Sequence, residues 1–225
     1  MSDLLIKLWQ NGILQLGIWE TIYMTLISTF FAYLIGLPVG LILRMTDRDG
    51  IHPIGWLNRT LGIIVNALRS IPFIILMVAM LPVAKFVVGT SLGNRAVIVT
   101  LVIAAAPYVA RMVESAAKEV NAGVIEAAQS MGASTFRIIC KVIIPEAKPA
   151  LITGGVISTV TILGYSAMAG TIGGGGLGQI AITYGYQKYD DQIVWLCVAL
   201  TIIIVQILQE FGMYIARRTD RRSRT

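Results

Sequence analysis

The sequence predicts an all-α integral membrane protein with about five membrane-spanning helices. Apolar residues make up 56% of the 225 positions and charged residues only 13%, which is about half the charged fraction of a soluble globular domain. The mean hydropathy is +0.77. Five separate stretches are long and apolar enough to cross a bilayer, which takes about 20 residues of helix. Lipid is therefore the expected solvent for most of the chain.

The five predicted spans cover residues 21–43, 61–84, 96–113, 151–169 and 193–215. Each is expected to be helical, because an open strand leaves its backbone hydrogen bonds unmade in hydrocarbon. Residues 1–20 form an N-terminal segment, residues 21–215 one transmembrane domain, and residues 216–225 a basic tail. The short apolar stretch at the start has no cleavage site of the kind that ends a removable signal peptide.

Small and cyclic residues inside the spans predict local geometry. Gly36 and Gly40 lie four residues apart, a spacing that lets two helix backbones approach closely. Pro72 and Pro107 are expected to kink the second and third spans, where neighbouring helices can satisfy the freed carbonyl groups. Packing alone remains the alternative explanation for all four residues.

The lysines and arginines predict the orientation, because cytoplasmic connections carry an excess of both. If the C-terminal tail is cytoplasmic, only four of the 18 basic residues lie outside, which leaves 14 inside. The outer four are Lys7, Lys85, Arg95 and Lys188. The inner set comprises Arg44, Arg48, Arg59, Arg69, Arg111, Lys118, Arg137, Lys141, Lys148 and the tail residues Arg217, Arg218, Arg221, Arg222 and Arg224. The N-terminus is therefore expected outside and the C-terminus in the cytoplasm.

Several classes of function are disfavoured. The formal charge of +6 does not indicate nucleic-acid binding, because the basic groups flank apolar spans and form no patch with interleaved aromatics. Cys140, Cys197 and His52 are too dispersed for a metal site. No nucleophile with a base, carboxylate pair or metal cluster lies within the spans, which argues against a membrane enzyme. A proton- or sodium-driven carrier usually has a carboxylate in the middle of a span. None of the five predicted spans has one at its centre.

Two glycine patterns bear on nucleotide binding. No G-x-x-x-x-G-K-[ST] loop occurs in the chain, so ATP hydrolysis is not expected here. Gly173, Gly175 and Gly178 do match G-x-G-x-x-G, but that fingerprint requires a strand before it and a phosphate-binding helix after it. We expect a tight reversal on the outer face instead, either near a docked partner or purely structural.

The connection between the third and fourth spans, residues 115–149, is too polar to cross a membrane and too regular for a loop. Val120, Val124, Ala128 and Met131 recur at helical spacing. Asn121 is a suitable N-cap, and Gly132 suits the left-handed residue that ends a helix. Ser134 can cap a second short helix, which Pro145 is expected to stop. The sequence thus predicts two short helices joined at a bend and projecting from the membrane.

Across this bend the chain reads Glu126-Ala127-Ala128, three residues, Gly132, nine residues, Val142-Ile143-Ile144-Pro145. The pattern resembles the EAA motif, EAA-x3-G-x9-I-x-L-P, of the membrane subunits of bacterial ABC importers, with Val and Ile at its two aliphatic positions. In that family the segment is the coupling helix, which sits in a cleft of the ATP-hydrolysing subunit. The resemblance therefore assigns ATPase coupling to Glu126, Ala127, Ala128, Gly132 and Pro145.

Further blocks resemble the methionine-importer permeases within that family and extend the likeness over nearly the whole chain. They are residues 69–76, 88–93, 164–170, 173–182 and 184–187. Many members carry an acidic residue at the place of Gln179. The resemblance implies a type I importer fold and alternating access in the bacterial inner membrane. It also implies a homodimer, an ATP-binding subunit dimer that uses ATP and Mg²⁺, and an outer substrate-binding lipoprotein; it assigns this chain no cofactor.

Candidates for the translocation path come from residue type. Met168 follows Tyr165 and Ser166 at the end of the fourth span, and an unbranched, polarizable side chain can close a narrow apolar gate. Plain packing is the alternative for Met168. Asn66 and Arg69 in the second span are further candidates for a polar lining. Two other functions stay open, a permease of the same superfamily for another solute and a stand-alone secondary transporter.

Overall fold

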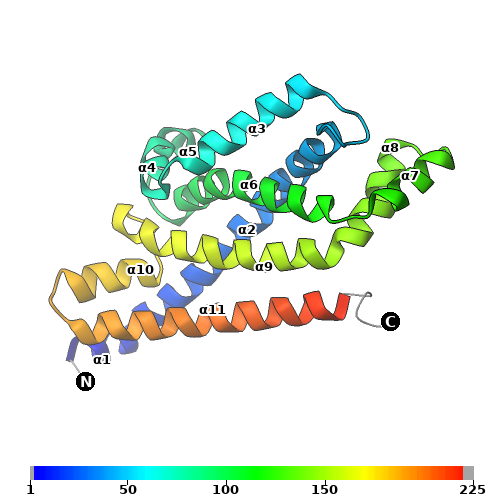
Figure 1. Cartoon of the computed structure of the whole chain (residues 1–225). Helices are drawn as coiled ribbons and strands as arrows, with labels where there is room; N and C mark the ends of the chain where they lie inside the picture. The colour runs from blue at the N-terminus through cyan, green and yellow to red at the C-terminus, as the bar shows by residue number, and fades with distance from the viewer. Residues whose placement is uncertain (1–2, 220–225) are drawn as a thin grey trace.

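The computed structural model describes residues 3–219, and within that range the chain is helical and contains no strand. Figure 1 shows long helices lying side by side, with a shorter helical bend at one end. The α-helices are α1 Asp3–Gln10, α2 Ile13–Thr46, α3 Gly55–Ser70, α4 Phe73–Ala79, α5 Leu81–Val88, α6 Asn94–Lys118, α7 Ala122–Ser130, α8 Thr135–Ile138, α9 Ile144–Ala169, α10 Leu177–Ile180 and α11 Asp191–Thr219. Two π-helical turns, Ile139–Ile143 and Ala181–Tyr186, and one 3-10 turn, Gly170–Ile172, complete the list.

Four helices in the described range are long and apolar enough to cross a membrane, and a bent pair supplies a fifth span if it is counted as one. The four are α2, the continuous helix Thr135–Ile172, α6 and α11. The prediction of about five spans is confirmed at this level. The helices exceed the predicted bounds: α2 begins at Ile13, and its 34 residues are more than the roughly 20 that a bilayer requires.

The second predicted span is broken rather than merely kinked. Helix α3 ends at Ser70 and α4 begins at Phe73, with an angle of 105° between them. Ile71 between them is extended (φ −80°, ψ 127°), as expected for a residue that precedes proline. Pro72 therefore breaks this span, whereas α6 continues through Pro107 as a single helix.

Helix α6 lies at the centre of the fold and packs against α2, α3, α4, α5 and α9. The closest approach is to α2. A Cβ on Gly36 would collide with the Val109 side chain, and one on Gly40 with the backbone of Ala110. The prediction of close backbone packing at these two glycines is confirmed, and small residues of this kind are what allow membrane helices to associate tightly.

Pro145 does not stop the second short helix, so that prediction is wrong. Helix α8, the π-turn Ile139–Ile143 and α9 follow one another without a break, and Pro145 lies in the first turn of α9. Proline has no N–H to give to the preceding turn. Here that turn has the wider π geometry, so the missing bond falls where the hydrogen-bond register already changes. Helix α9 is therefore directly continuous with the bend.

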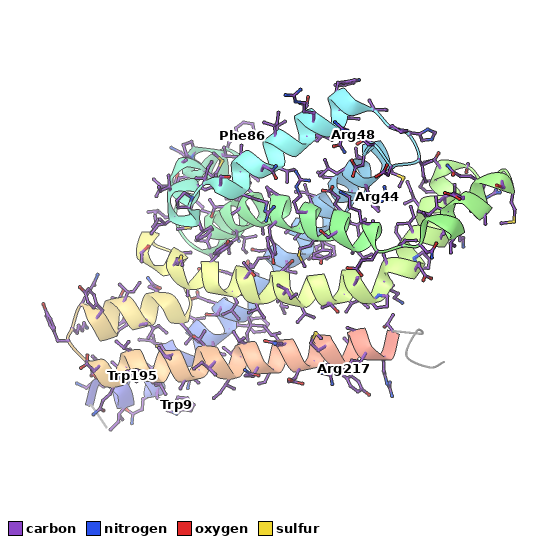
Figure 2. The ribbon with its side chains drawn as sticks, in the orientation of Figure 1. Trp9, Arg44, Arg48, Phe86, Trp195 and Arg217 are labelled. Atoms are coloured by element: carbon purple, nitrogen blue, oxygen red, sulfur yellow. The ribbon has the colours of Figure 1, made fainter. Side chains whose placement is uncertain are left out.

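Helix α11 packs along α9 and closes the fold together with α10 and the second π-turn. A separate apolar cluster holds these elements to α1 and α2, with Leu14, Leu163 and Ile193 almost completely buried. Figure 2 shows that Trp9 and Trp195 lie near one end of the molecule, while Arg44, Arg48 and Arg217 lie toward the other. Both tryptophans are exposed.

Candidate functional site

The bend between α7 and α8 is built by the three predicted capping residues. The Asn121 side chain accepts a hydrogen bond from the N–H of Gly123 at 2.8 Å, and that of Ser134 accepts a longer one from Arg137 at 3.4 Å. Gly132 has φ +74°. Its N–H donates to Gln129 O and that of Ala133 to Ala128 O, the pair of bonds that defines a Schellman helix end.

The two faces of α7 are buried to different extents. Ile125 and Ala128 are buried against the core, whereas Glu126 and Ala127 are exposed. Val124 and Met131, which share helical spacing with Ala128, face outward, and Met131 is 81% exposed. The bend therefore carries exposed apolar side chains outside the core, among them Phe136, which is 76% exposed. Exposed apolar side chains of this kind are typical of contact sites for a protein partner or for a membrane.

A cavity of about 330 Å³ lies between α7 and the segment after α2. Glu126 and Gln129 line one side, and Arg44 and Asp49 line the other. The Arg44 guanidinium donates to the backbone oxygen of Asp49 at 3.0 Å, while its Nε is buried without a hydrogen-bond partner. Glu126 thus borders an opening with charge on both sides, large enough to receive a side chain from a partner.

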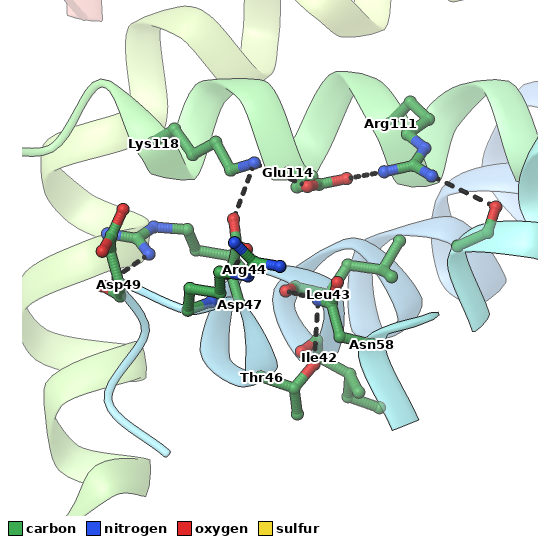
Figure 3. A network of polar contacts seen from close by, with 12 residues as sticks. Ile42, Leu43, Arg44, Thr46, Asp47, Asp49, Asn58, Arg111, Glu114 and Lys118 are labelled. Atoms are coloured by element: carbon green, nitrogen blue, oxygen red, sulfur yellow. Dashed lines mark hydrogen bonds and ion pairs between the residues drawn. The ribbon is translucent and has the colours of Figure 1, made fainter. Parts of the chain in front are cut away.

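A polar network connects the C-terminal ends of α2 and α6 with each other and with α3 (Figure 3). Lys118 contacts Asp47 at 2.9 Å and Glu114 at 2.8 Å. Glu114, which is 6% exposed, also pairs with Arg111 at 2.6 Å. Arg111 in turn donates to Asn66 Oδ1 at 3.0 Å. The hydrogen bond from Lys118 is the main cause that holds the pKa of Asp47 below its ordinary value of 3.8.

The same side of the molecule has a second link to the bend. His52, in the connection between α2 and α3, lies 2.6 Å from the Thr135 hydroxyl at the start of α8. The predicted coupling segment is therefore tied to α2 and α3 by polar contacts in addition to its own helices.

The path candidates lie on two elements that meet at the broken span. The Tyr165 ring stacks on Phe73 of α4, with ring centroids 4.4 Å apart. Arg69 lies over the Tyr108 ring at 5.9 Å, and Asn66 is one turn away on α3. Met168 is 48% exposed at the end of α9. Ser166 is separated from this group: it is buried, and its hydroxyl donates to Leu163 O of its own helix at 2.8 Å.

The glycine-rich segment at the opposite end forms a tight reversal, held by two residues that the sequence reasoning missed. The Glu20 carboxylate accepts bonds from Asn94 Nδ2 at 2.7 Å and from the N–H of Gly176 at 2.8 Å. The Asn94 side chain in turn accepts from the N–H of Gly175 at 2.7 Å. A Cβ on Gly175 would collide with Glu20. A glutamate at the edge of a predicted span was the available signal, because a charge there requires a partner.

The described residues offer little for cofactor or metal chemistry. Over residues 3–219 no group of three or more His, Cys, Asp or Glu side chains could hold a metal ion. The glycine-rich reversal is preceded by a helix and a 3-10 turn, and the dinucleotide fingerprint requires a strand at that place. The tail arginines Arg221, Arg222 and Arg224 lie outside the described residues.

Relatives resemble the chain over most of its length. "Probable D-methionine transport system permease protein MetI" of Vibrio cholerae is 48% identical over 212 residues, 94% of either chain. "D-methionine transport system permease protein MetI" of Escherichia coli K12 is 50% identical over 154 residues, which are 68% of this chain and 71% of that one.

Solved structures extend the likeness to the fold. A chain of "Inward facing conformations of the MetNI methionine ABC transporter" superposes with a TM-score of 0.93 at 45% identity, covering 98% of this chain and all of that one. "Crystal structure of an amino acid ABC transporter with histidines" gives 0.78 at 19% identity and shows the fold alone. Residues 36–224 match the model of the family described as "Binding-protein-dependent transport system inner membrane component". The chain therefore belongs to this family of binding-protein-dependent transport permeases.

Proposed function

We propose that this chain is the membrane-spanning permease of an ATP-driven methionine importer in the bacterial inner membrane. The observation that carries the proposal is the exposed bend with Glu126 and Gly132, on a chain 48% identical to a protein named as a methionine permease. The chain is the non-catalytic subunit. ATP and Mg²⁺ are bound by a separate ATPase dimer, and an outer substrate-binding lipoprotein delivers methionine.

The proposed orientation places the bend in the cytoplasm and the N-terminus outside. Arg44, Arg48 and Arg217 lie toward the same end as the bend, whereas the exposed Trp9 and Trp195 lie near the other. Basic residues favour the cytoplasmic side of a membrane, and tryptophan favours the interfaces. The distribution of the basic residues along the sequence supports the same orientation.

Coupling follows from the continuity of the helix that leaves the bend. A displacement of α7 and α8 by the ATPase is carried into α9, because Thr135–Ile172 is one unbroken helix that passes through Pro145. Tyr165 and Met168 lie on this helix, and Tyr165 is stacked on the broken span. Motion at the bend thereby changes the position of the proposed path and gate residues.

The path itself is proposed to form between two copies of the chain. Helices α4 and α5 expose apolar side chains to the outside of the protomer, among them Ile75, Val78 and Phe86. A second copy packed on this side would enclose Asn66, Arg69, Tyr165 and Met168. Alternating access then amounts to the two copies moving relative to each other around that enclosure.

The test is methionine uptake by proteoliposomes that contain permease, ATPase and binding protein. ATP should drive accumulation, and Glu126→Lys should abolish it while hydrolysis continues, because a reversed charge beside the cavity prevents docking. Glu119→Lys, an exposed charge reversal outside α7, is the matched control. Normal uptake by the Glu126 variant would refute the coupling assignment.

Two alternatives remain distinguishable in the same assay. Accumulation of another solute, with no response to methionine, would keep the family mechanism and change the substrate. Uptake by the permease reconstituted without any ATPase would instead identify a stand-alone secondary transporter.

A further inference from the structure

An apolar groove of about 490 Å³ runs between α2, α9 and α11. Leu26, Phe30 and Leu37 of α2 form one wall, and Leu151 and Val156 of α9 form the floor; Phe211 of α11 lies on the other side. All three helices are membrane spans. The groove therefore opens at the depth of the hydrocarbon core.

The groove is built for hydrocarbon rather than for a polar ligand. Its most polar central group, the Tyr33 hydroxyl, already donates to Leu151 O at 3.2 Å. Gly155 leaves space in the groove because it has no side chain; a Cβ on Gly155 would lie 3.4 Å from the Tyr33 hydroxyl. An unbranched apolar chain fits such a space, and a ligand that needed hydrogen bonds would lose them here.

One end of the groove is positively charged. Lys148 lines it and is exposed. Gly212 of α11 lies against Val156 of α9, and the two helices run in opposite directions (Figure 1). Arg218, seven residues after Phe211 and so on the same helix face, therefore lies toward the same end as Lys148. The Arg218 guanidinium is 5.2 Å from the Tyr214 ring and is exposed.

We propose that this groove binds one acyl chain of an anionic phospholipid, whose headgroup is held by Lys148 and Arg218. The apolar lining at membrane depth matches the acyl chain of such a lipid, and the cations at the membrane surface match its headgroup. The proposal goes beyond transport and does not depend on the substrate.

A second copy of the chain is a poorer occupant than a lipid. The exposed apolar side chains of α4 and α5 provide a separate surface for a second copy. The basic end of the groove also matches an anionic headgroup, for which an apolar protein surface has no counterpart.

The test is native mass spectrometry of the permease–ATPase complex purified in detergent, with phosphatidylglycerol or phosphatidylcholine added. The wild type should retain phosphatidylglycerol in preference, and Gly155→Leu should lose it because the added side chain fills the groove. Gly164→Leu is the matched control on the same helix, where a Cβ would meet nothing within 4 Å. If Gly155→Leu does not assemble, Thr159→Phe fills the same groove from the next turn.

The headgroup is tested by removing charge. Lys148→Gln and Arg218→Gln should each weaken phosphatidylglycerol retention about five-fold, the effect of roughly 1 kcal/mol per cation near an anionic surface. Arg217→Gln, next in the chain but off this face, should change it little. Equal retention of both lipids, or unchanged retention when the groove is filled, would overturn the proposal. A disulfide between two copies carrying Leu26→Cys would overturn it as well, because the second copy would then occupy the groove.

Discussion

Gly132 is required for its backbone conformation and not for lack of space around it. Its φ of +74° lies in the left-handed region, and a Cβ at this position would meet nothing within 4 Å. An L-residue in that region costs roughly 1–2 kcal/mol. Any larger effect of a substitution must come from what the new side chain meets outside the protomer.

This separates folding from coupling at Gly132. We expect Gly132→Trp to lower the free energy of unfolding by about 1–2 kcal/mol and to abolish ATP-driven uptake, because its bulk projects into the docking surface. Gly12→Trp is the matched control, since Gly12 has φ +71° and equally open surroundings between α1 and α2. It should be destabilised to the same extent and still transport. Equal transport by both variants would contradict the assignment.

Gly175 is required for lack of space around it and not for its backbone conformation. Its Cβ would collide with the carboxylate of Glu20, which accepts hydrogen bonds from Asn94 and Gly176. We expect Gly175→Ala to cost on the order of 2 kcal/mol or more, since hydrogen bonds to a charged group are lost. Glu20→Gln, which keeps one acceptor oxygen, should cost less. Thermal unfolding in detergent measures both, and Gly164→Ala serves as a control in open space.

At the scale of the elements, α8, the π-turn Ile139–Ile143 and α9 form one continuous helix. Met168 lies at its far end, 48% exposed. We expect Met168→Ala to increase the passive leak of proteoliposomes, because shortening an apolar gate side chain leaves the resting path less tightly closed. Ile157→Ala shortens another exposed side chain of the same helix and should leave the leak unchanged. An unchanged leak in the Met168 variant would remove the gate assignment.

The junction of α2 and α6 has a predictable pH dependence. The hydrogen bond from Lys118 is the main cause that lowers the pKa of Asp47. The contact therefore stabilises the fold fully above the ordinary pKa of 3.8. This stabilisation is lost as the pH falls through the lowered pKa. The unfolding temperatures of the wild type and Asp47→Asn should differ by a constant small amount, worth at most about 1 kcal/mol, from pH 8 to pH 5. The difference should vanish in stronger acid. A difference that changes between pH 8 and pH 5 would show that another group controls the junction.

Local signals explain which elements were predictable. Asn121, Gly132 and Ser134 act through bonds within a few residues, and each is found in its expected role. Pro145 follows a π-turn, where the hydrogen-bond register already changes, and the local pattern around the proline gives no sign of that turn. The hydrogen bond from the N–H of Gly176 to the Glu20 carboxylate joins residues 156 positions apart. Contacts of that kind depend on how the spans assemble, so the sequence indicated a reversal without showing what holds it.

The sequence likewise predicted only some of the features of the candidate site. Residue type and spacing placed Glu126 and Gly132 on an exposed bend, but not the outward direction of Met131 and Phe136. A helical period does not distinguish a face covered by the core from one covered by a partner. Ser166 was grouped with Met168 by proximity in sequence, and two residues of helix rotation place it in the interior instead.

At the scale of the whole molecule, the bend lies at one end and α5 at the other, with the membrane spans between them (Figure 1). We propose that force from an ATP-hydrolysing partner enters at the bend alone. Met131 on the bend is 81% exposed and Phe86 on α5 is 91% exposed. These two apolar side chains thus offer matched positions for detecting which end meets the partner.

The most direct measurement places a photo-crosslinking amino acid at position 131 or 86 in the permease, assembled with its ATPase in a membrane. Position 131 should crosslink to the ATPase subunit, and position 86 should not. Loss of the product in Glu126→Lys would tie the contact to the motif. A crosslink to the ATPase from position 86, with none from position 131, would contradict the account.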